Sequence, residues 1–114
     1  MFEKYEYAEI TIEELADIHP SLYRFCDVRD EVSYRYGSIP KAENISNIVE
    51  LAEEGKLDKN ISYVLYCMKG IQSMDMAYEL RGMGYDAVSL KGGYAAWLLS
   101  LIHISEPTRQ AEIS

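Results

Sequence analysis

The stretch Ile61-Ser62-Tyr63-Val64-Leu65-Tyr66-Cys67-Met68-Lys69-Gly70-Ile71-Gln72-Ser73 indicates the fold class more clearly than any other part of the chain. Its first five residues, 61–65, form an apolar run with β-branched members, which predicts a buried strand. From Ser73 onward, apolar residues recur at the spacing of a helix and predict one that opens at Ser73. These apolar positions are Met76, Ala77, Leu80 and Met83. A cysteine is therefore expected where a buried strand ends and a helix begins.

The position of Cys67 between a strand and a helix favours a reactive thiolate. In open α/β sheets, ligands bind at the carboxyl ends of strands. The N–H groups of the turn and the positive end of the following helix both stabilise an anion there, so the thiol should have a lowered pKa and act as a nucleophilic thiolate. Gly70 can adopt backbone angles that turn amides inward, and Lys69 adds positive charge at the mouth. The alternative is that Cys67 is a small hydrophobic residue that closes a strand.

Four short motifs follow one another along the chain. They are Asp27-Val28-Arg29 (D-x-R), residues 36–45 (similar to G-H-I-P-G-A-x-N), residues 67–73 (C-x-x-G-x-x-S) and residues 90–97 (L-x-G-G-x-x-A-W). The ordered set resembles the motifs of rhodanese-like sulfurtransferases, and the resemblance covers about residues 10–99. Ser38 stands where the family usually has His, and Lys41 where it usually has Gly. Both lie in a structural turn, so these departures concern local geometry rather than chemistry.

The resemblance implies a single-domain sulfurtransferase of the thiosulfate sulfurtransferase type. Cys67 would take a sulfane sulfur from thiosulfate or a persulfide donor as a persulfide, and would pass it to a thiol, a protein cysteine or another nucleophile. The substrate-binding residues would be those of the loop: Met68, Lys69, Gly70, Ile71, Gln72 and Ser73. Lys69 fits the C-x-K-G form of thiosulfate-using members; a solvated loop lysine is the alternative. Ser73 would cap the helix and donate to the sulfur, and Asp27 and Arg29 would pair with each other and support the loop.

Strands and helices alternate along the sequence, which predicts a parallel α/β sheet with right-handed crossovers. Together with the resemblance, this predicts an open, mainly parallel central sheet of about five strands with helices on both faces. Besides the elements above, strands are expected at 22–26 and 86–90, and helices from Thr11 to before Pro20, at 30–36, at 46–54 and from 93 to about 99. The domain is expected to span residues 1–99. Residues 100–114, interrupted by Pro107, are expected to be a disordered or foreign extension.

Composition narrows the classes of partner. The chain has 114 residues, 48% hydrophobic and 26% charged, and a net charge of −8, which suits one globular domain. The negative charge argues against a nucleic-acid or anionic-membrane partner, because both require clustered Lys and Arg. No stretch approaches the roughly 20 apolar residues of a membrane span, and the first residues lack the features of a signal peptide. A cytoplasmic protein is expected.

Two cysteines form neither a disulfide framework nor a metal site. Cys26 lies in the expected strand 22–26, and we interpret it as a core residue; the alternative is a resolving thiol for an oxidised Cys67. His19 and His103 are isolated and are expected in surface or loop positions. No metal or cofactor is predicted.

Two other functions compete with sulfur transfer. Cysteine phosphatases and arsenate reductases also hold a cysteine in an anion-binding loop, but they require Arg at the sixth position after it, where this chain has Ser73. The second alternative is a sulfur carrier or regulatory binding module with little turnover. Regulatory modules of this kind typically lose the cysteine, whereas this chain keeps it.

Overall fold

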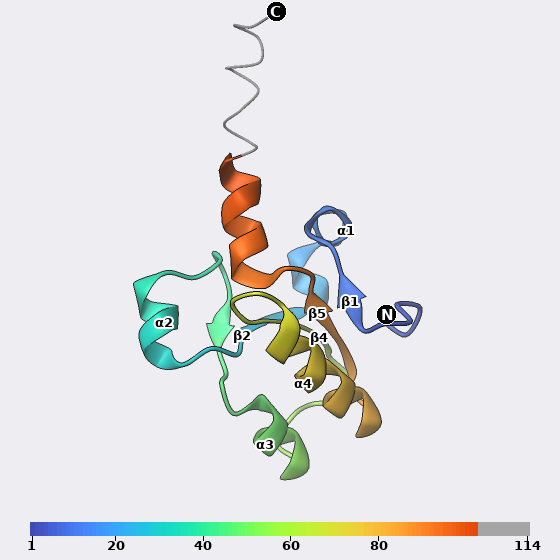
Figure 1. Cartoon of the computed structure of the whole chain (residues 1–114). Coiled ribbons are helices and arrows are strands. Elements are labelled where there is room, and N and C mark those ends of the chain that lie inside the picture. The colour runs from blue at the N-terminus through green and yellow to red at the C-terminus, as the bar shows by residue number, and fades with distance from the viewer. Residues whose placement is uncertain (103–114) are drawn as a thin grey trace, which may run out of the picture.

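Five parallel strands form a single open sheet in the order β1-β5-β4-β2-β3 in the computed structural model, which describes residues 1–102 (Figure 1). The strands are β1 (Glu9–Ile10), β2 (Arg24–Asp27), β3 (Glu43–Asn44), β4 (Ser62–Tyr66) and β5 (Asp86–Leu90). β4 lies at the centre, with Cys26 of β2 opposite Leu65 on one side and Ser89 of β5 opposite Leu65 on the other. The predicted fold class is confirmed.

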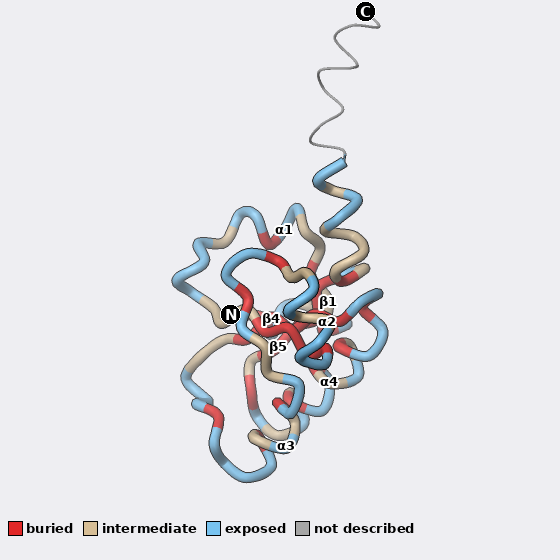
Figure 2. The backbone as a smooth tube through the Cα atoms, turned by 90° about the vertical axis from the view of Figure 1, so that its left-hand side faces the viewer, coloured by how far each residue is buried: buried red, intermediate tan, exposed pale blue. Residues whose placement is uncertain are grey.

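Helices cover both faces of this sheet. They are α1 (Ile12–Ala16), α2 (Glu31–Tyr36), α3 (Ile48–Glu53), α4 (Ile71–Gly82), the short 3-10 helix η1 (Pro20–Leu22) and the helical residues 93–102. α3 and α4 lie on one side, whereas α1 and the helix at 93–102 lie on the other (Figure 1). The buried backbone is concentrated in the central strands between these layers (Figure 2). The two faces therefore have separate apolar cores.

Cys26 belongs to the core beneath α3 and α4. Its side chain is fully buried among apolar neighbours that include Ile48, Leu65 and Leu80. Burial raises the pKa of the Cys26 thiol to about 12, and its sulfur donates to the Arg24 carbonyl at 3.8 Å. A thiol so hard to ionise is poorly suited to attack another sulfur. The interpretation of Cys26 as a core residue is confirmed.

Local capping determines where the first helices begin. Thr11 accepts a hydrogen bond from the Glu14 amide at 3.0 Å, and the Glu14 carboxylate accepts one from the Thr11 amide at 2.8 Å, which forms the expected capping box. α1 ends at Ala16, before Pro20 as predicted, and the chain then turns toward η1. Since η1 takes up Leu22, β2 begins at Arg24 instead of residue 22. Asp30 caps α2 through the Ser33 amide at 2.8 Å.

The C-terminal helix continues to residue 102, past the expected end at 99. His103 and residues 103–114 of the expected extension lie outside the described residues. His19 is exposed and accepts from the Ser21 amide at 3.1 Å, so its expected surface position is confirmed. Within residues 1–102, no helix is long and apolar enough to cross a membrane.

Candidate active site

Cys67 directly follows the central strand β4, at the carboxyl edge of the sheet. The residue is buried, with 5% of its surface exposed. Residues 67–70 connect it to α4, which begins at Ile71, two residues earlier than the predicted start at Ser73. The predicted strand–cysteine–helix arrangement is thus present, with a shorter connection than the sequence suggested.

The Cys67 sulfur accepts two backbone hydrogen bonds from this connection. The amide of Gly70 lies 3.2 Å from Sγ and the amide of Ser73 lies 3.3 Å from it. Gly70 is the N-cap residue of α4, has a φ of +89° and offers no side chain to cap the helix. The sulfur therefore accepts a hydrogen bond from the Ser73 N–H, one of the first N–H groups of α4, which have no partner within the helix. The prediction that Ser73 caps the helix is wrong, because Ser73 lies inside the first turn.

These contacts favour the negatively charged form of the sulfur. Burial raises the pKa of Cys67, but hydrogen bonds from the Ser73 hydroxyl and from the amides of Ser73, Gly70 and Lys69 lower it. The hydrogen bonds outweigh burial, so the pKa of the Cys67 thiol lies below its ordinary value. A thiolate is the nucleophilic form of cysteine, and this loop can therefore support attack by Cys67.

The N-terminus of the helix at 93–102 holds the loop from outside. The Tyr94 amide donates to the Cys67 carbonyl at 2.9 Å, and the Ala95 amide donates to the Met68 carbonyl at 2.9 Å. These two hydrogen bonds fix the backbone of Cys67 and Met68 at the start of the loop. The approach is close enough that a Cβ on Gly93 would overlap the Cys67 carbonyl oxygen. The motif at 90–97 therefore shapes the loop, a role that its sequence alone did not reveal.

A buried pair of serines lies under the same loop. The Ser73 hydroxyl is 2.7 Å from the Ser89 hydroxyl of β5, and both residues are fully buried. Ser89 also donates to the Gly70 carbonyl at 3.5 Å. Ser89 was absent from the predicted site, because a serine inside a strand pattern carries no signal of its own.

Asp27 and Arg29 form the predicted ion pair, and both are buried. The guanidinium donates to the Asp27 carboxylate from Nη2 at 2.7 Å and from Nε at 3.0 Å. Nη2 also donates to the Gly37 carbonyl at 2.6 Å. The guanidinium carbon lies 4.3 Å from the centre of the Tyr94 ring, so the pair contacts the residue whose amide holds the Cys67 carbonyl.

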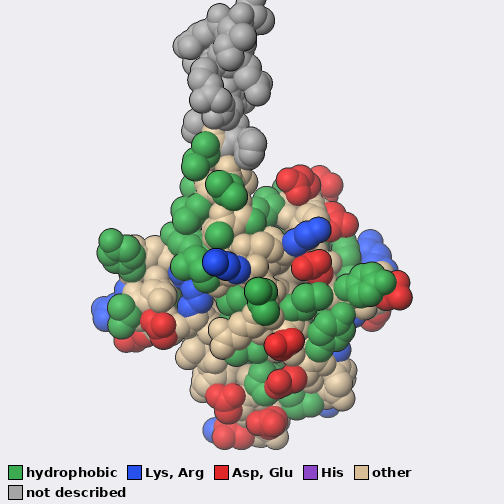
Figure 3. Space-filling view, viewed as in Figure 1, with side chains coloured by type: hydrophobic (Ala, Val, Ile, Leu, Met, Phe, Trp, Pro, Cys, Tyr) green, Lys and Arg blue, Asp and Glu red, His purple; other side chains and the backbone are tan. Residues whose placement is uncertain are grey.

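The remaining predicted loop residues face outward. Met68 is 44% exposed and Ile71 is 73% exposed, and Lys69 and Gln72 are also exposed. Acidic side chains gather over α3 and α4 on the face shown in Figure 3. Lys69 is thus an exposed cation on the loop. Of the six predicted loop residues, Gly70 and Ser73 donate hydrogen bonds to the sulfur.

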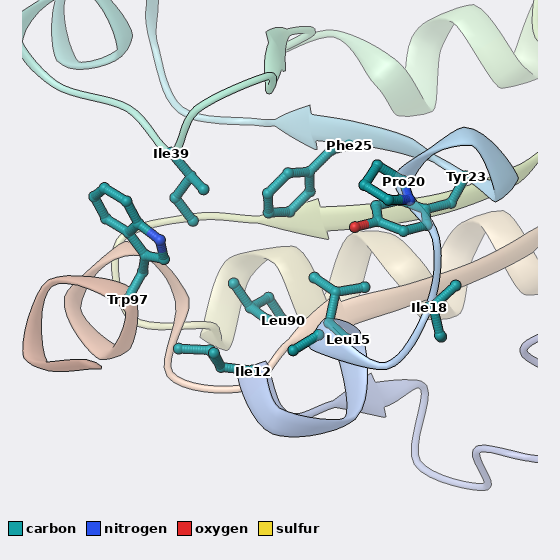
Figure 4. A pocket seen from close by; sticks show the side chains of 10 residues that line it. Ile12, Leu15, Ile18, Pro20, Tyr23, Phe25, Ile39, Leu90 and Trp97 are labelled. Carbon is teal, nitrogen blue, oxygen red and sulfur yellow. The ribbon is translucent and has the colours of Figure 1, made fainter. Parts of the chain in front are cut away.

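The other face of the sheet carries an apolar hollow of about 230 Å³ (Figure 4). Its lining comes from α1, η1, β2 and the C-terminal helix, and includes Leu15, Phe25, Ile39 and Trp97. Among the described residues that line it, none belongs to the loop 67–73. The hollow is therefore separate from the candidate active site.

Comparisons with known proteins identify the family to which the chain belongs. The family described as "Rhodanese-like domain" matches residues 11–100. "Putative sulfurtransferase YtwF" of Bacillus subtilis is 33% identical over 94 residues, which cover 81% of this chain and 88% of that protein. "Thiosulfate sulfurtransferase GlpE" of Shewanella oneidensis is 38% identical over 72 residues, covering 62% of this chain and 71% of that protein. The crystal structure of a rhodanese-related protein from Thermoplasma volcanium has 29% identity and a TM-score of 0.69, covering 81% of this chain and 91% of that one.

Proposed function

The chain belongs to the family of rhodanese-like sulfurtransferase domains, and from that premise we propose that it moves a sulfane sulfur through a persulfide on Cys67. The donor is thiosulfate or a persulfide, and the acceptor is a thiol, a protein cysteine or another nucleophile. The observation that carries the proposal is the pair of amides, from Gly70 and Ser73, that bind the Cys67 sulfur.

The reaction has two covalent steps. In the first, the Cys67 thiolate attacks the outer sulfur of thiosulfate, a new S–S bond forms, and sulfite leaves with the electron pair of the broken S–S bond. In the second, an acceptor thiolate attacks the same outer sulfur and forms its own S–S bond. Cys67 then leaves as a thiolate, so the enzyme returns to its starting state without a redox cofactor.

The loop amides stabilise negative charge at both stages. They donate to the thiolate before the attack and to the persulfide after it, and no solvent has to reorganise because the donors are already in place. Lys69 attracts the sulfonate end of thiosulfate, since its charge stands at the mouth of the site. Met68, Ile71 and Gln72 border the approach to the sulfur with exposed side chains.

Asp27 and Arg29 support the loop indirectly. Their ion pair places the guanidinium on the Tyr94 ring, and Tyr94 holds the Cys67 carbonyl through its amide. We therefore assign them a structural role. The phosphatase alternative lacks its arginine, because Ser73 occupies that position and its hydroxyl is bonded to Ser89.

Intact mass spectrometry after incubation with thiosulfate tests the proposal. The protein should gain the mass of one sulfur atom, and cyanide should remove it. Cys67→Ala should abolish the gain, whereas Cys26→Ala should keep it. A gain that survives in Cys67→Ala would place the sulfur elsewhere and overturn the assignment. Loading without turnover toward thiol acceptors would instead identify a sulfur carrier.

A further inference from the structure

The apolar hollow beside α1 is large enough for a small molecule. Its volume is about 230 Å³, and every residue that lines it is aliphatic or aromatic (Figure 4). In a protein interior, an apolar cavity of about 150 Å³ holds one benzene molecule. The hollow is about half as large again, which gives room for two fused rings. Three of its lining side chains are themselves aromatic, namely Tyr23, Phe25 and Trp97.

Two polar groups open into this apolar space. Figure 4 shows the hydroxyl of Tyr23 and the ring nitrogen of Trp97 on the sides of their rings that face the other lining residues. Neither group has a hydrogen-bond partner among residues 1–102. No side-chain nitrogen or oxygen in that part of the chain is both unpaired and completely buried, so both groups remain accessible. Since Tyr and Trp normally pair these groups when the ring is buried, a ligand oxygen can accept from either.

The hollow continues into a second one of about 260 Å³, and Tyr23 and Phe25 line both. The second hollow adds charged side chains to the lining. Arg24 donates two hydrogen bonds to the Glu43 carboxylate, at 2.7 and 2.9 Å, so these two charges balance each other. Lys41 is exposed and has no ion pair or hydrogen-bond partner among the described residues. The two hollows therefore carry one unbalanced positive charge, on a chain whose net charge is −8.

The backbone of Lys41 is in a conformation that disfavours any residue with a side chain. Its φ is +73°, in the left-handed region that glycine adopts freely and other residues rarely occupy. Glycine at this position would relieve the strain, but it would leave the second hollow without its unpaired cation. Strained residues are concentrated at ligand-binding sites, where the side chain is needed. A binding role therefore accounts for a lysine at a position where glycine would fold better.

We propose that the two hollows form one binding site for a small aromatic carboxylate, with its rings in the apolar hollow and its carboxylate directed toward Lys41. The rings pack against Phe25 and Trp97, since aromatic groups gain from offset or edge-to-face contact with each other. One unbalanced positive charge matches the single negative charge of a carboxylate better than the double charge of a phosphate. None of the residues that line the two hollows belongs to the loop 67–73, so this site is independent of the proposed sulfur transfer.

The test is a titration with naphthoate, a carboxylate on two fused rings, followed by NMR of the isotope-labelled protein. Trp97 is the only tryptophan of the chain, so the protein gives one indole N–H signal, and this signal comes from the lining of the hollow. Naphthoate should shift it saturably, with a dissociation constant on the order of 0.1–1 mM for a ligand of this size. An indole signal that does not move at millimolar naphthoate would overturn the proposal.

Three comparisons test the chemistry of the ligand. Naphthamide has the same rings without the charge and should bind roughly two- to fivefold more weakly, the range for one exposed ion pair. Lys41→Gly should weaken naphthoate binding by a similar factor and naphthamide binding less. Because this variant relieves a positive φ, its loss of binding cannot come from misfolding. Octanoate carries the same charge on an aliphatic chain and should bind more weakly than naphthoate; tighter binding would overturn the aromatic assignment.

Lys56→Gly is the matched control for the charge. Lys56 is exposed and follows α3 on the other face of the sheet, so its loss changes the net charge equally and should leave naphthoate binding as in wild type. Ala16→Phe should block binding, because Ala16 lines the hollow from the exposed end of α1. Equal weakening in the two lysine variants, equal affinity for naphthoate and naphthamide, or full binding by Ala16→Phe would each contradict the proposed site.

Discussion

Gly93→Ala should lower stability and distort the candidate active site, because Gly93 lies where the helix at 93–102 contacts the loop that begins at Cys67. Its φ is +59°, and an added Cβ would overlap the Cys67 carbonyl oxygen and lie 2.9 Å from the Gly70 amide nitrogen. The left-handed backbone costs alanine roughly 1–2 kcal/mol. Displacement of the loop would also break the hydrogen bonds of the Tyr94 and Ala95 amides, at about 1 kcal/mol each. The free energy of unfolding should fall by roughly 3–4 kcal/mol.

Two other glycines separate these contributions. Gly55 has a φ of +72° with nothing within 4 Å of the added Cβ, so Gly55→Ala should cost roughly 1–2 kcal/mol from backbone strain alone. Gly82 ends α4 in open space without a positive φ, and Gly82→Ala should be neutral or stabilising by up to about 1 kcal/mol.

Urea unfolding gives the three free energies, and iodoacetamide reports on the loop. Gly93→Ala should also slow alkylation of Cys67, because the amides that lower its pKa would shift, whereas the two controls should not. A loss in Gly93→Ala no larger than in Gly55→Ala would refute the claim that this helix shapes the loop.

The remaining predictions concern single side chains and the ionisation of the thiol. Cys26→Ala should lower the free energy of unfolding by about 1 kcal/mol through a small cavity and keep persulfide loading; a stable but inactive variant would identify a resolving thiol. Lys69→Ala should weaken the use of thiosulfate more than that of a neutral persulfide donor, with a difference that shrinks as salt rises; equal losses would indicate support of the loop. Lys41→Gly should raise the free energy of unfolding by roughly 0.5–1 kcal/mol, because Lys41 has a φ of +73° that glycine adopts freely; an unfolding free energy below that of wild type would show that the lysine side chain itself stabilises the turn. Because the pKa of Cys67 is lowered, alkylation should stay fast as the pH falls from about 8 to 7, below the ordinary thiol pKa of about 8.5, whereas a tenfold drop would indicate an ordinary thiol.

The fold was predictable where the sequence pattern is long. The central strand β4 and the strand β5 each have five residues, and their apolar runs are evident. β1 and β3 have two residues each, too few for any period to show. They exist because β5 and β2 offer unpaired edges to them. Edge strands of this length depend on the tertiary structure rather than on local propensity.

The site was predictable in kind but not in its supporting contacts. The C-x-x-G-x-x-S loop indicated an anion-binding turn, and the departure at Lys41 indicated altered geometry, which its positive φ bears out. The predicted start of α4 at Ser73 is two residues too late, because serine is a common cap residue but here the Ser73 amide lies inside the first turn and donates to the Cys67 sulfur. The role of Ser89 could not be predicted, because its hydrogen bond to Ser73, sixteen residues earlier in the sequence, depends on how α4 lies over β5.

The acidic surface of the chain and the amides of the loop influence the ionisation of Cys67 over different distances. The net charge is −8, and exposed acidic side chains lie over α3 and α4. Solvent and salt screen such charges over a Debye length of about 8 Å at physiological ionic strength. The amides of Gly70 and Ser73 act on the sulfur at 3.2 and 3.3 Å, and Cys67, Gly70 and Ser73 are all buried, so screening between them is weak. The contacts therefore govern the ionisation of Cys67, and the acidic surface bears mainly on which donors and acceptors approach it.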